Sequence, residues 1–186
     1  MMLSGFKGIF WLEFLHRLWG RVIGVVFFLP FVFFLARGWV NLAMAVRFGL
    51  MLVVGGFQGV LGWYMVKSGL VDNPHVSQYR LTAHLLAAFL IYGYMFWVAM
   101  SLLCRPDAGK RHKWFGGAVA LTVLVMLTVI SGGFVAGLNA GKVYNTFPMM
   151  GQYWVPPDFM SLNPFWRNFF ENPAAVQFNH RVLATT

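Results

Sequence analysis

The chain alternates between long apolar runs and short polar connections. The complete runs are about as long as the 20-odd residues that a helix needs to cross a bilayer. They cover residues 11–36, 48–66, 79–103 and 114–138, and a further run covers 174–186. This pattern predicts four membrane-spanning helices and the start of a fifth.

Composition agrees with that pattern. The chain is 59% hydrophobic and only 10% charged, whereas a soluble domain carries about 25% charged residues. The predicted fold class is therefore all-α, a polytopic membrane helix bundle. Most of the basic residues behind the net charge of +9 lie between the apolar runs, and membrane topology and anionic lipid explain them better than nucleic acid does. The single cysteine, Cys104, excludes an intrachain disulfide and a cysteine-ligated metal cluster.

The basic residues also predict an orientation. The connections 37–47 and 105–113 hold two and four Lys or Arg, whereas 67–78 and 139–173 hold one and two. Positively charged connections stay on the cytoplasmic or matrix side. The N-terminus and the long connection 139–173 are therefore expected on the outer side.

Ionisable residues interrupt the first apolar run, and in hydrocarbon such residues mark a functional site by default. They are Glu13, His16, Arg17 and Arg21. At helical spacing His16 shares a face with Gly20 and Gly24, which leaves room beside the imidazole for a flat molecule such as a porphyrin. The alternative is a buried histidine hydrogen-bonded between helices above a small-residue packing seam. This stretch alone favours neither interpretation.

A second histidine supports the porphyrin interpretation. The first and third helices are predicted to run in the same direction, and His16 and His84 each lie about five residues, or about 8 Å, from the outer end. Two level imidazoles on parallel helices can hold one six-coordinate heme iron. We therefore predict that these histidines ligate one heme, although His84 can also be read as a core histidine paired with a neighbouring helix. Candidate partners for the propionates are Arg17, Arg21 and Arg80, with Lys67 a weaker one.

The histidine stretch recurs near the end of the chain. EFLHRL at 13–18 and QFNHRV at 177–182 share an aromatic residue, a histidine and an arginine. His180 also enters its run from the outer side. The spacing from His16 to His84 is 84 − 16 = 68 residues, so an internal duplication places the partner of His180 near position 248 (180 + 68). We therefore interpret the chain as a fragment of a duplicated protein, with His75 and His112 solvated in connections.

Several blocks carry a family resemblance. They are EFLHRLWGRVIG, FQGVLGWYMVKSGL, VSQYRLTAHL, SGGFVAGLNAGKVYNTFPMMG and NPAAVQFNHRVLA. Together they resemble the heme A synthase family, in the form found in alphaproteobacteria and mitochondria. The resemblance implies a four-plus-four architecture of eight helices, of which the first and the last two are missing here. It also implies that His16 and His84 hold the substrate heme, and that His180 ligates a resident heme b whose second ligand is absent.

The activity that the resemblance implies is oxidation of the C8 methyl of heme O to a formyl group, which gives heme A. The oxygen comes from water, and Glu13 matches the functional glutamate of the family. A positioned carboxylate can act as the base that such an oxidation needs; alternatively, Glu13 only favours the positive end of its helix. The competing function is a b-type di-heme cytochrome that only transfers electrons. A small transporter would leave the level histidines unexplained.

These expectations give the chain three parts. Residues 1–138 form the heme-binding bundle of the N-terminal half, ending in the first helix of the second half (114–138). Residues 139–173 form an outer loop with an interfacial helix at 159–171, and 174–186 begin the next membrane helix. The expected location is the bacterial plasma membrane or the mitochondrial inner membrane, with the site toward the outer side. Expected partners are heme O, membrane lipid, heme O synthase, oxidase assembly factors and a second copy of the chain.

Overall fold

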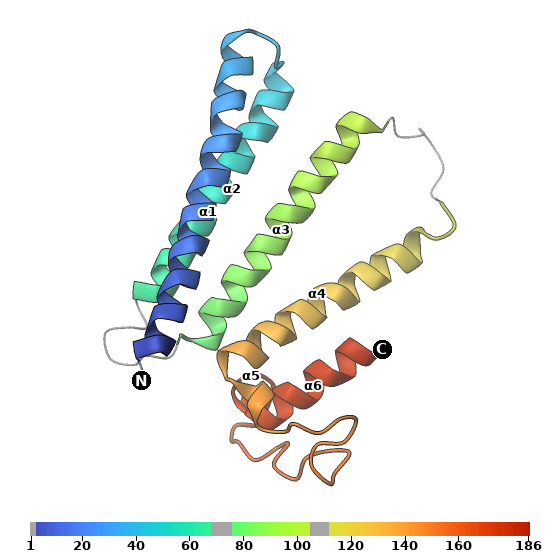
Figure 1. Ribbon diagram of the computed structural model, residues 1–186. Helices are drawn as coiled ribbons and strands as arrows, with labels where there is room; N and C mark the ends of the chain where they lie inside the picture. Colours follow the sequence, from blue (N-terminus) through green and yellow to red (C-terminus); the bar gives the residue numbers. More distant parts are fainter. Residues whose placement is uncertain (1–2, 68–75, 105–111) are drawn as a thin grey trace. The chain divides into compact units, whose positions relative to one another are not determined.

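The computed structural model describes residues 3–67, 76–104 and 112–186, and it is all-α (Figure 1). Four of its helices are long and apolar enough to cross a membrane. They are α1 (Leu3–Ala36), α2 (Leu42–Lys67), α3 (Gln78–Leu103) and α4 (Phe115–Gly137). The prediction of an all-α membrane protein with four spanning helices is confirmed.

Two helix starts lie earlier than the apolar runs predicted. α1 begins at Leu3 rather than at residue 11, and α2 begins at Leu42 rather than at 48. The start of α2 has a local cause, because the Asn41 side-chain oxygen accepts a hydrogen bond from the backbone N–H of Met44 at 2.9 Å. Such an N-cap fixes a helix start whatever the polarity of the first turns. The connection before α2 is therefore shorter than predicted.

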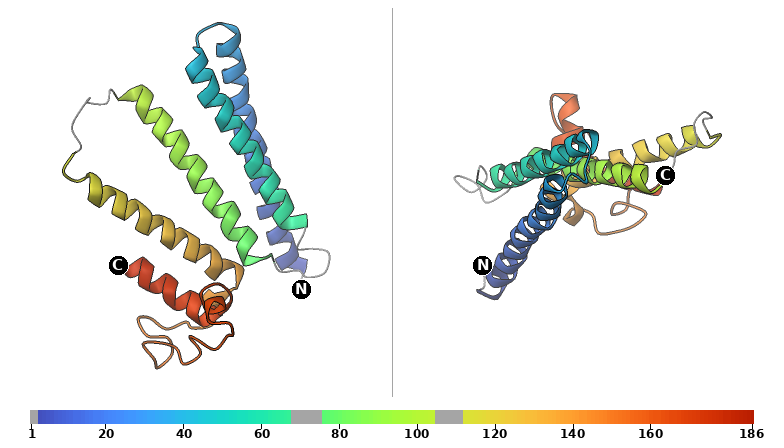
Figure 2. Two further views of the ribbon diagram at one scale, coloured as in Figure 1. Left: turned by 180° about the vertical axis from the view of Figure 1, so that it is seen from behind. Right: turned by 90° about the horizontal axis from the view of Figure 1, so that it is seen from above.

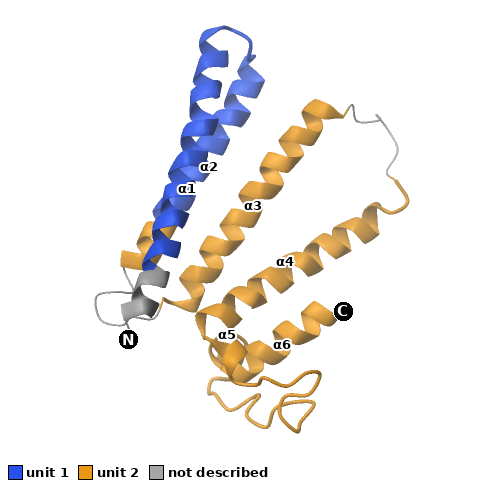
Figure 3. Cartoon of the chain, in the orientation of Figure 1, with its two compact units in different colours: residues 1–60 blue, residues 61–186 orange. Residues whose placement is uncertain are grey.

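The chain forms two compact units, residues 1–60 and 61–186, which are described separately (Figure 3). The first unit holds α1 and most of α2. Phe48 of α2 meets Phe27 and Phe31 of α1 edge-on, with ring centroids 6.2 and 5.9 Å apart. Gly38, with φ +69°, takes the left-handed conformation after the end of α1, which glycine adopts readily.

In the second unit α4 lies between α3 and α6 (Pro173–Thr185), as Figure 1 and Figure 2 show. Two glycines one turn apart bring α4 against α3. A Cβ on Gly137 would lie 2.4 Å from Cα of Gln78, and a Cβ on Gly133 would lie 3.0 Å from Cα of Thr82. This is the small-xxx-small arrangement by which membrane helices approach closely. The crossing brings the two backbones into contact.

The long connection between α4 and α6 is mostly irregular. It contains the short helices η1 (Ala140–Lys142), η2 (Phe165–Arg167) and α5 (Asn168–Glu171). The helix expected over 159–171 is thus confined to 165–171. Pro164 precedes it, and the residue before a proline is disfavoured in helical conformation.

Two buried asparagines organise this connection. The Asn168 amide donates to the carbonyls of Leu162 and Phe165, both at 2.9 Å, and accepts from the Leu162 N–H at 3.0 Å. Asn172 caps α6 by accepting from the backbone N–H groups of Ala174 and Ala175 at 3.0 and 3.3 Å. The start of α6 is therefore fixed by the loop that leads into it.

Candidate functional site

Among the predicted site residues, His180 has a hydrogen-bond partner on a neighbouring helix. It lies half-buried on α6, and its Nδ1 is 2.8 Å from Oγ of Ser131 on α4. The Ser131 hydroxyl also lies 2.8 Å from the carbonyl of Thr128, to which it can donate. A hydroxyl that donates there can accept from Nδ1–H, because it has one proton and two lone pairs. In that tautomer Nε2 is free to bind a metal.

His180 and His84, both in the second unit, share a further feature, a glycine on the preceding long helix. A Cβ on Gly132 of α4 would lie 3.1 Å from Cε1 of His180, and a Cβ on Gly62 of α2 would lie 3.0 Å from Cε1 of His84. Both glycines lie five residues before the end of their helix (137 − 132 and 67 − 62). Each imidazole therefore packs against bare helix backbone.

Arg80 lies one turn before His84 on α3, in the part of the second unit that holds the end of α2. Its guanidinium is 5.0 Å from the ring centroid of Tyr64 on α2, a cation–π arrangement. His84 is half-buried. A propionate candidate and a ligand candidate thus both lie beside the end of α2.

The first unit holds the other predicted site residues on α1. Glu13 and Arg17 form an ion pair one turn apart, and both side chains are about half exposed. His16 and Arg21 are exposed as well. A Cβ on Gly20 or Gly24 would meet nothing within 4 Å, so the face below His16 is open within its unit. Because His16 and His84 belong to different units, their joint ligation of one heme remains a prediction.

The histidines lie at different distances from the starts of their helices. His16 lies 13 residues beyond Leu3, the first residue of α1, and His84 lies six residues beyond Gln78, the first residue of α3. His180 lies seven residues beyond Pro173. Of the two histidines predicted to be solvated, His112 is exposed, and His75 falls outside the described residues.

The repeated stretch is used differently in its two copies. On α6, Gln177 is 4% exposed, and it accepts from the backbone N–H of Tyr144 at 3.2 Å while donating to the Tyr144 carbonyl at 2.8 Å. Arg181 donates to the carbonyls of Tyr144 and Thr146 at 2.8 and 2.6 Å. Glu13 and Arg17 pair with each other instead, whereas Gln177 and Arg181 bind the loop. This difference explains why the second copy has Gln177 where the first has Glu13, because a carboxylate has no proton to donate to the Tyr144 carbonyl.

We therefore expect Gln177→Glu to release the loop around Tyr144. The new carboxylate loses the bond to the Tyr144 carbonyl and competes for Arg181, at a cost of about 1–3 kcal/mol. Limited proteolysis at Tyr144 with chymotrypsin should then be about tenfold faster or more. The exposed Gln152 in the same loop gives the control Gln152→Glu, which should change little. Equal protection of Gln177→Glu and the unsubstituted protein would contradict this account.

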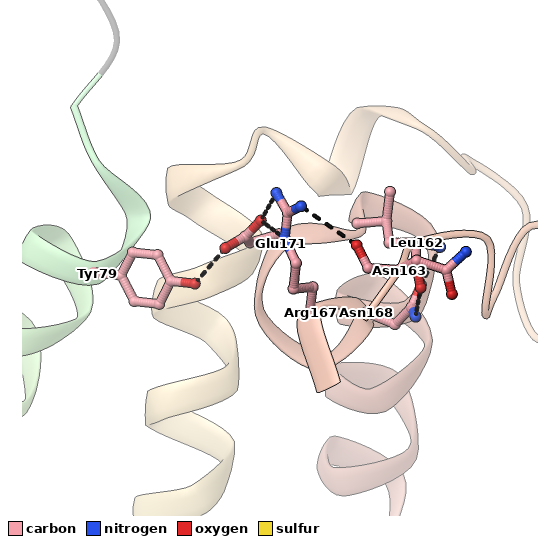
Figure 4. A network of polar contacts seen from close by, with 6 residues as sticks. All are labelled: Tyr79, Leu162, Asn163, Arg167, Asn168 and Glu171. Carbon is pink, nitrogen blue, oxygen red and sulfur yellow. Dashed lines mark hydrogen bonds and ion pairs between the residues drawn. The ribbon is translucent and has the colours of Figure 1, made fainter. Parts of the chain in front are cut away.

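A second set of polar contacts joins the loop to α3 (Figure 4). The Tyr79 hydroxyl donates to Oε1 of Glu171 at 3.0 Å, and Arg167 Nε donates to Oε2 at 2.7 Å. The Arg167 guanidinium, followed by the Tyr79 hydroxyl, lowers the pKa of Glu171. Within the loop the Tyr144 hydroxyl donates to Asp158 at 2.8 Å, and that bond raises the pKa of Tyr144. The loop is thus tied to both α3 and α6.

The donor set fits a heme iron. In the described ranges no three His, Cys, Asp or Glu side chains come together as a metal-ion site, but isolated imidazoles suit an iron that the porphyrin already holds by four nitrogens. Ser131 and Gly132 were not predicted from the sequence. Their partner His180 is 49 residues from Ser131, and the only signal available was the Ser-Gly-Gly triplet inside an apolar run.

The fold defines an integral membrane protein with four candidate membrane-spanning helices, and histidines lie on α1, α3 and α6. The family described as cytochrome oxidase assembly protein (COX15-CtaA) matches residues 1–186, and the chain belongs to this family. It is 52% identical over 191 residues to the heme A synthase of Nitrosospira multiformis, covering 100% of this chain and 53% of that protein.

Relatives from animals and plants match as well. The chain is 46% identical over 196 residues to heme A synthase COX15 of Homo sapiens, covering 100% of this chain and 48% of that protein. The corresponding protein of Arabidopsis thaliana is 44% identical over 199 residues, covering 100% and 44%. The chain spans about half the length of the curated relatives it matches. No solved structure matches it significantly.

Proposed function

We propose that this chain forms part of a heme A synthase, which oxidises the C8 methyl of heme O to a formyl group and so supplies heme A to terminal oxidases. The observation that carries the proposal is the identity of 44–52%, over the whole chain, to bacterial, plant and human proteins named heme A synthase. The oxidation releases electrons and protons, and water supplies the formyl oxygen. The protein must therefore hold the porphyrin, accept protons near its edge and pass electrons on.

His16 and His84 hold the substrate heme in this proposal, and His180 ligates a resident heme b. The Ser131 Oγ, 2.8 Å from Nδ1 of His180, supports the second assignment, because it can accept from Nδ1–H when Nε2 binds iron. When bound, heme b supplies the one-electron chemistry that removes electrons from the site. Arg17, Arg21 and Arg80 are the candidates for binding propionates. Arg80 has the strongest support. It is on the same helix as His84, α3, and its guanidinium lies against the ring of Tyr64.

Glu13 is the proposed base. It lies three residues before His16, on the same face of α1 and one turn nearer the helix start. Its carboxylate pairs with Arg17, which holds it at a defined place. A positioned carboxylate can accept the protons released when the methyl group is oxidised.

Glu13→Gln tests this role. We expect it to keep the heme content and to lower formyl product by about 10²–10⁴-fold, the range typical of a lost general base. The measurement is chromatography and mass analysis of the extracted porphyrins. Glu171→Gln removes a carboxylate of the outer loop instead, and it should leave the product intact. Undiminished heme A in Glu13→Gln would remove Glu13 from the mechanism.

The same extraction separates the enzyme from the electron carrier. An unsubstituted protein that yields only unmodified heme, without hydroxylated or formyl porphyrin, would be a b-type cytochrome with a structural Glu13. The distribution of Lys and Arg supports a site on the outer side of a bacterial plasma membrane or mitochondrial inner membrane. Heme O synthase, oxidase assembly factors and a second copy of the chain are the proposed protein partners.

A further inference from the structure

Two adjacent residues of α4, Ser131 and Gly132, both meet the imidazole of His180. We infer that they are positioning residues, which fix the orientation and tautomer of His180 so that its Nε2 is presented to heme iron. The inference rests on the proposed function, because it takes His180 as a heme ligand. It adds that residues of α4 set the ring orientation of that ligand and the basicity of its Nε2.

The contacts of Ser131 match the tautomer that iron ligation through Nε2 requires. With Nε2 on iron, Nδ1 carries the proton and can donate to Ser131 Oγ at 2.8 Å, while the Ser131 hydroxyl can donate to the Thr128 carbonyl at 2.8 Å. A flipped ring would turn a carbon toward the Ser131 oxygen and lose the bond. Ser131 thus favours one ring orientation, and it can accept the Nδ1 proton of the tautomer that binds iron through Nε2. Donation from Nδ1–H also makes Nε2 a stronger base toward iron.

Gly132 fixes the distance between the ring and the backbone of α4. A Cβ there would stand 3.1 Å from Cε1 of His180 and 3.7 Å from each ring nitrogen, which is tighter than an ordinary contact for the carbon. The backbone of α4 is regular at this position, so alanine would meet no conformational strain. The imidazole alone would have to move. The matching contact between Gly62 and His84, at 3.0 Å, shows the same arrangement at a second ligand candidate.

The test uses the purified, heme-loaded protein and four variants. Ser131→Ala removes the acceptor, and Ser131→Thr keeps a hydroxyl. Gly132→Ala adds the Cβ, and Gly117→Ala adds one on the same helix where nothing lies within 4 Å. The readouts are heme content, the midpoint potential of the resident heme and the low-temperature EPR spectrum of its oxidised form.

Ser131→Ala should shift the midpoint potential upward, because a less basic Nε2 stabilises ferric iron less. It should also weaken heme retention by about tenfold or more, as loss of a ligand's hydrogen-bond partner does. Ser131→Thr should stay close to the unsubstituted protein. Gly132→Ala should alter the EPR spectrum or lower the heme content, and Gly117→Ala should do neither.

His180→Ala separates a failure of the ligand assignment from a failure of the positioning role. If that variant keeps the resident heme with unchanged spectra, His180 is no ligand and the proposed function fails at this residue. If it loses the heme while Ser131→Ala and Gly132→Ala both match the unsubstituted protein, His180 is a ligand and the positioning role is wrong. A purely structural role for Ser131 predicts lower thermal stability with an unchanged potential, which would also overturn the inference.

Discussion

Replacing Gly137 by alanine is expected to force α3 and α4 apart at their closest approach. The added Cβ would fall 2.4 Å from Cα of Gln78, and a backbone atom cannot move aside as a side chain does. Overpacking of this kind costs about 1–3 kcal/mol, occasionally more, and a backbone clash belongs at the upper end. Thermal unfolding in detergent, followed by circular dichroism, should show a clearly lower midpoint.

Gly116→Ala is the matched control for that substitution. It lies on the same helix, and a Cβ there would meet nothing within 4 Å. Alanine is the better helix former by up to about 1 kcal/mol, so this variant should be as stable as the original or slightly more so. Equal unfolding midpoints for the two variants would show that the close crossing of α3 and α4 does not contribute to stability.

His16→Ala and His84→Ala are each expected to abolish bis-histidine ligation of the same heme. The physical reason is that a six-coordinate low-spin iron needs both axial imidazoles, so either loss leaves one position open. Absorption and EPR spectra of the purified protein should change in the same way in both variants. His112→Ala, at an exposed position, should leave the spectra unchanged. Spectra in which the two variants affect different hemes would contradict the shared site.

The helices that cross the membrane could be predicted because hydrophobic length alone decides them. The starts of α1 and α2 could not, since a helix extends beyond its apolar part wherever caps and connections allow it. Asn41 is an example: its side chain fixes the start of α2 six residues before the apolar run begins. Hydropathy carries no information about such a hydrogen bond.

The histidines stood out from the sequence because ionisable residues are rare in apolar runs. The surroundings of the histidines could not be predicted, because Gly62, Ser131 and Gly132 contact histidines on other helices and form no periodic pattern in the sequence. Glu13 and Gln177 are a further case in which the sequence did not predict the contacts of a residue. They occupy matching places in a repeated stretch, yet one pairs with an arginine of its own helix and the other binds the backbone of Tyr144.

The bonds between α6 and the loop before it also bear on the order in which the chain folds during its synthesis. Gln177 and Arg181 bind loop residues at most 37 positions earlier in the chain. Contacts between residues this close in sequence form early, while later parts of a chain are still being made. The loop and α6 can therefore form as one local unit, in which the polar side chains of the helix are already paired to the loop backbone.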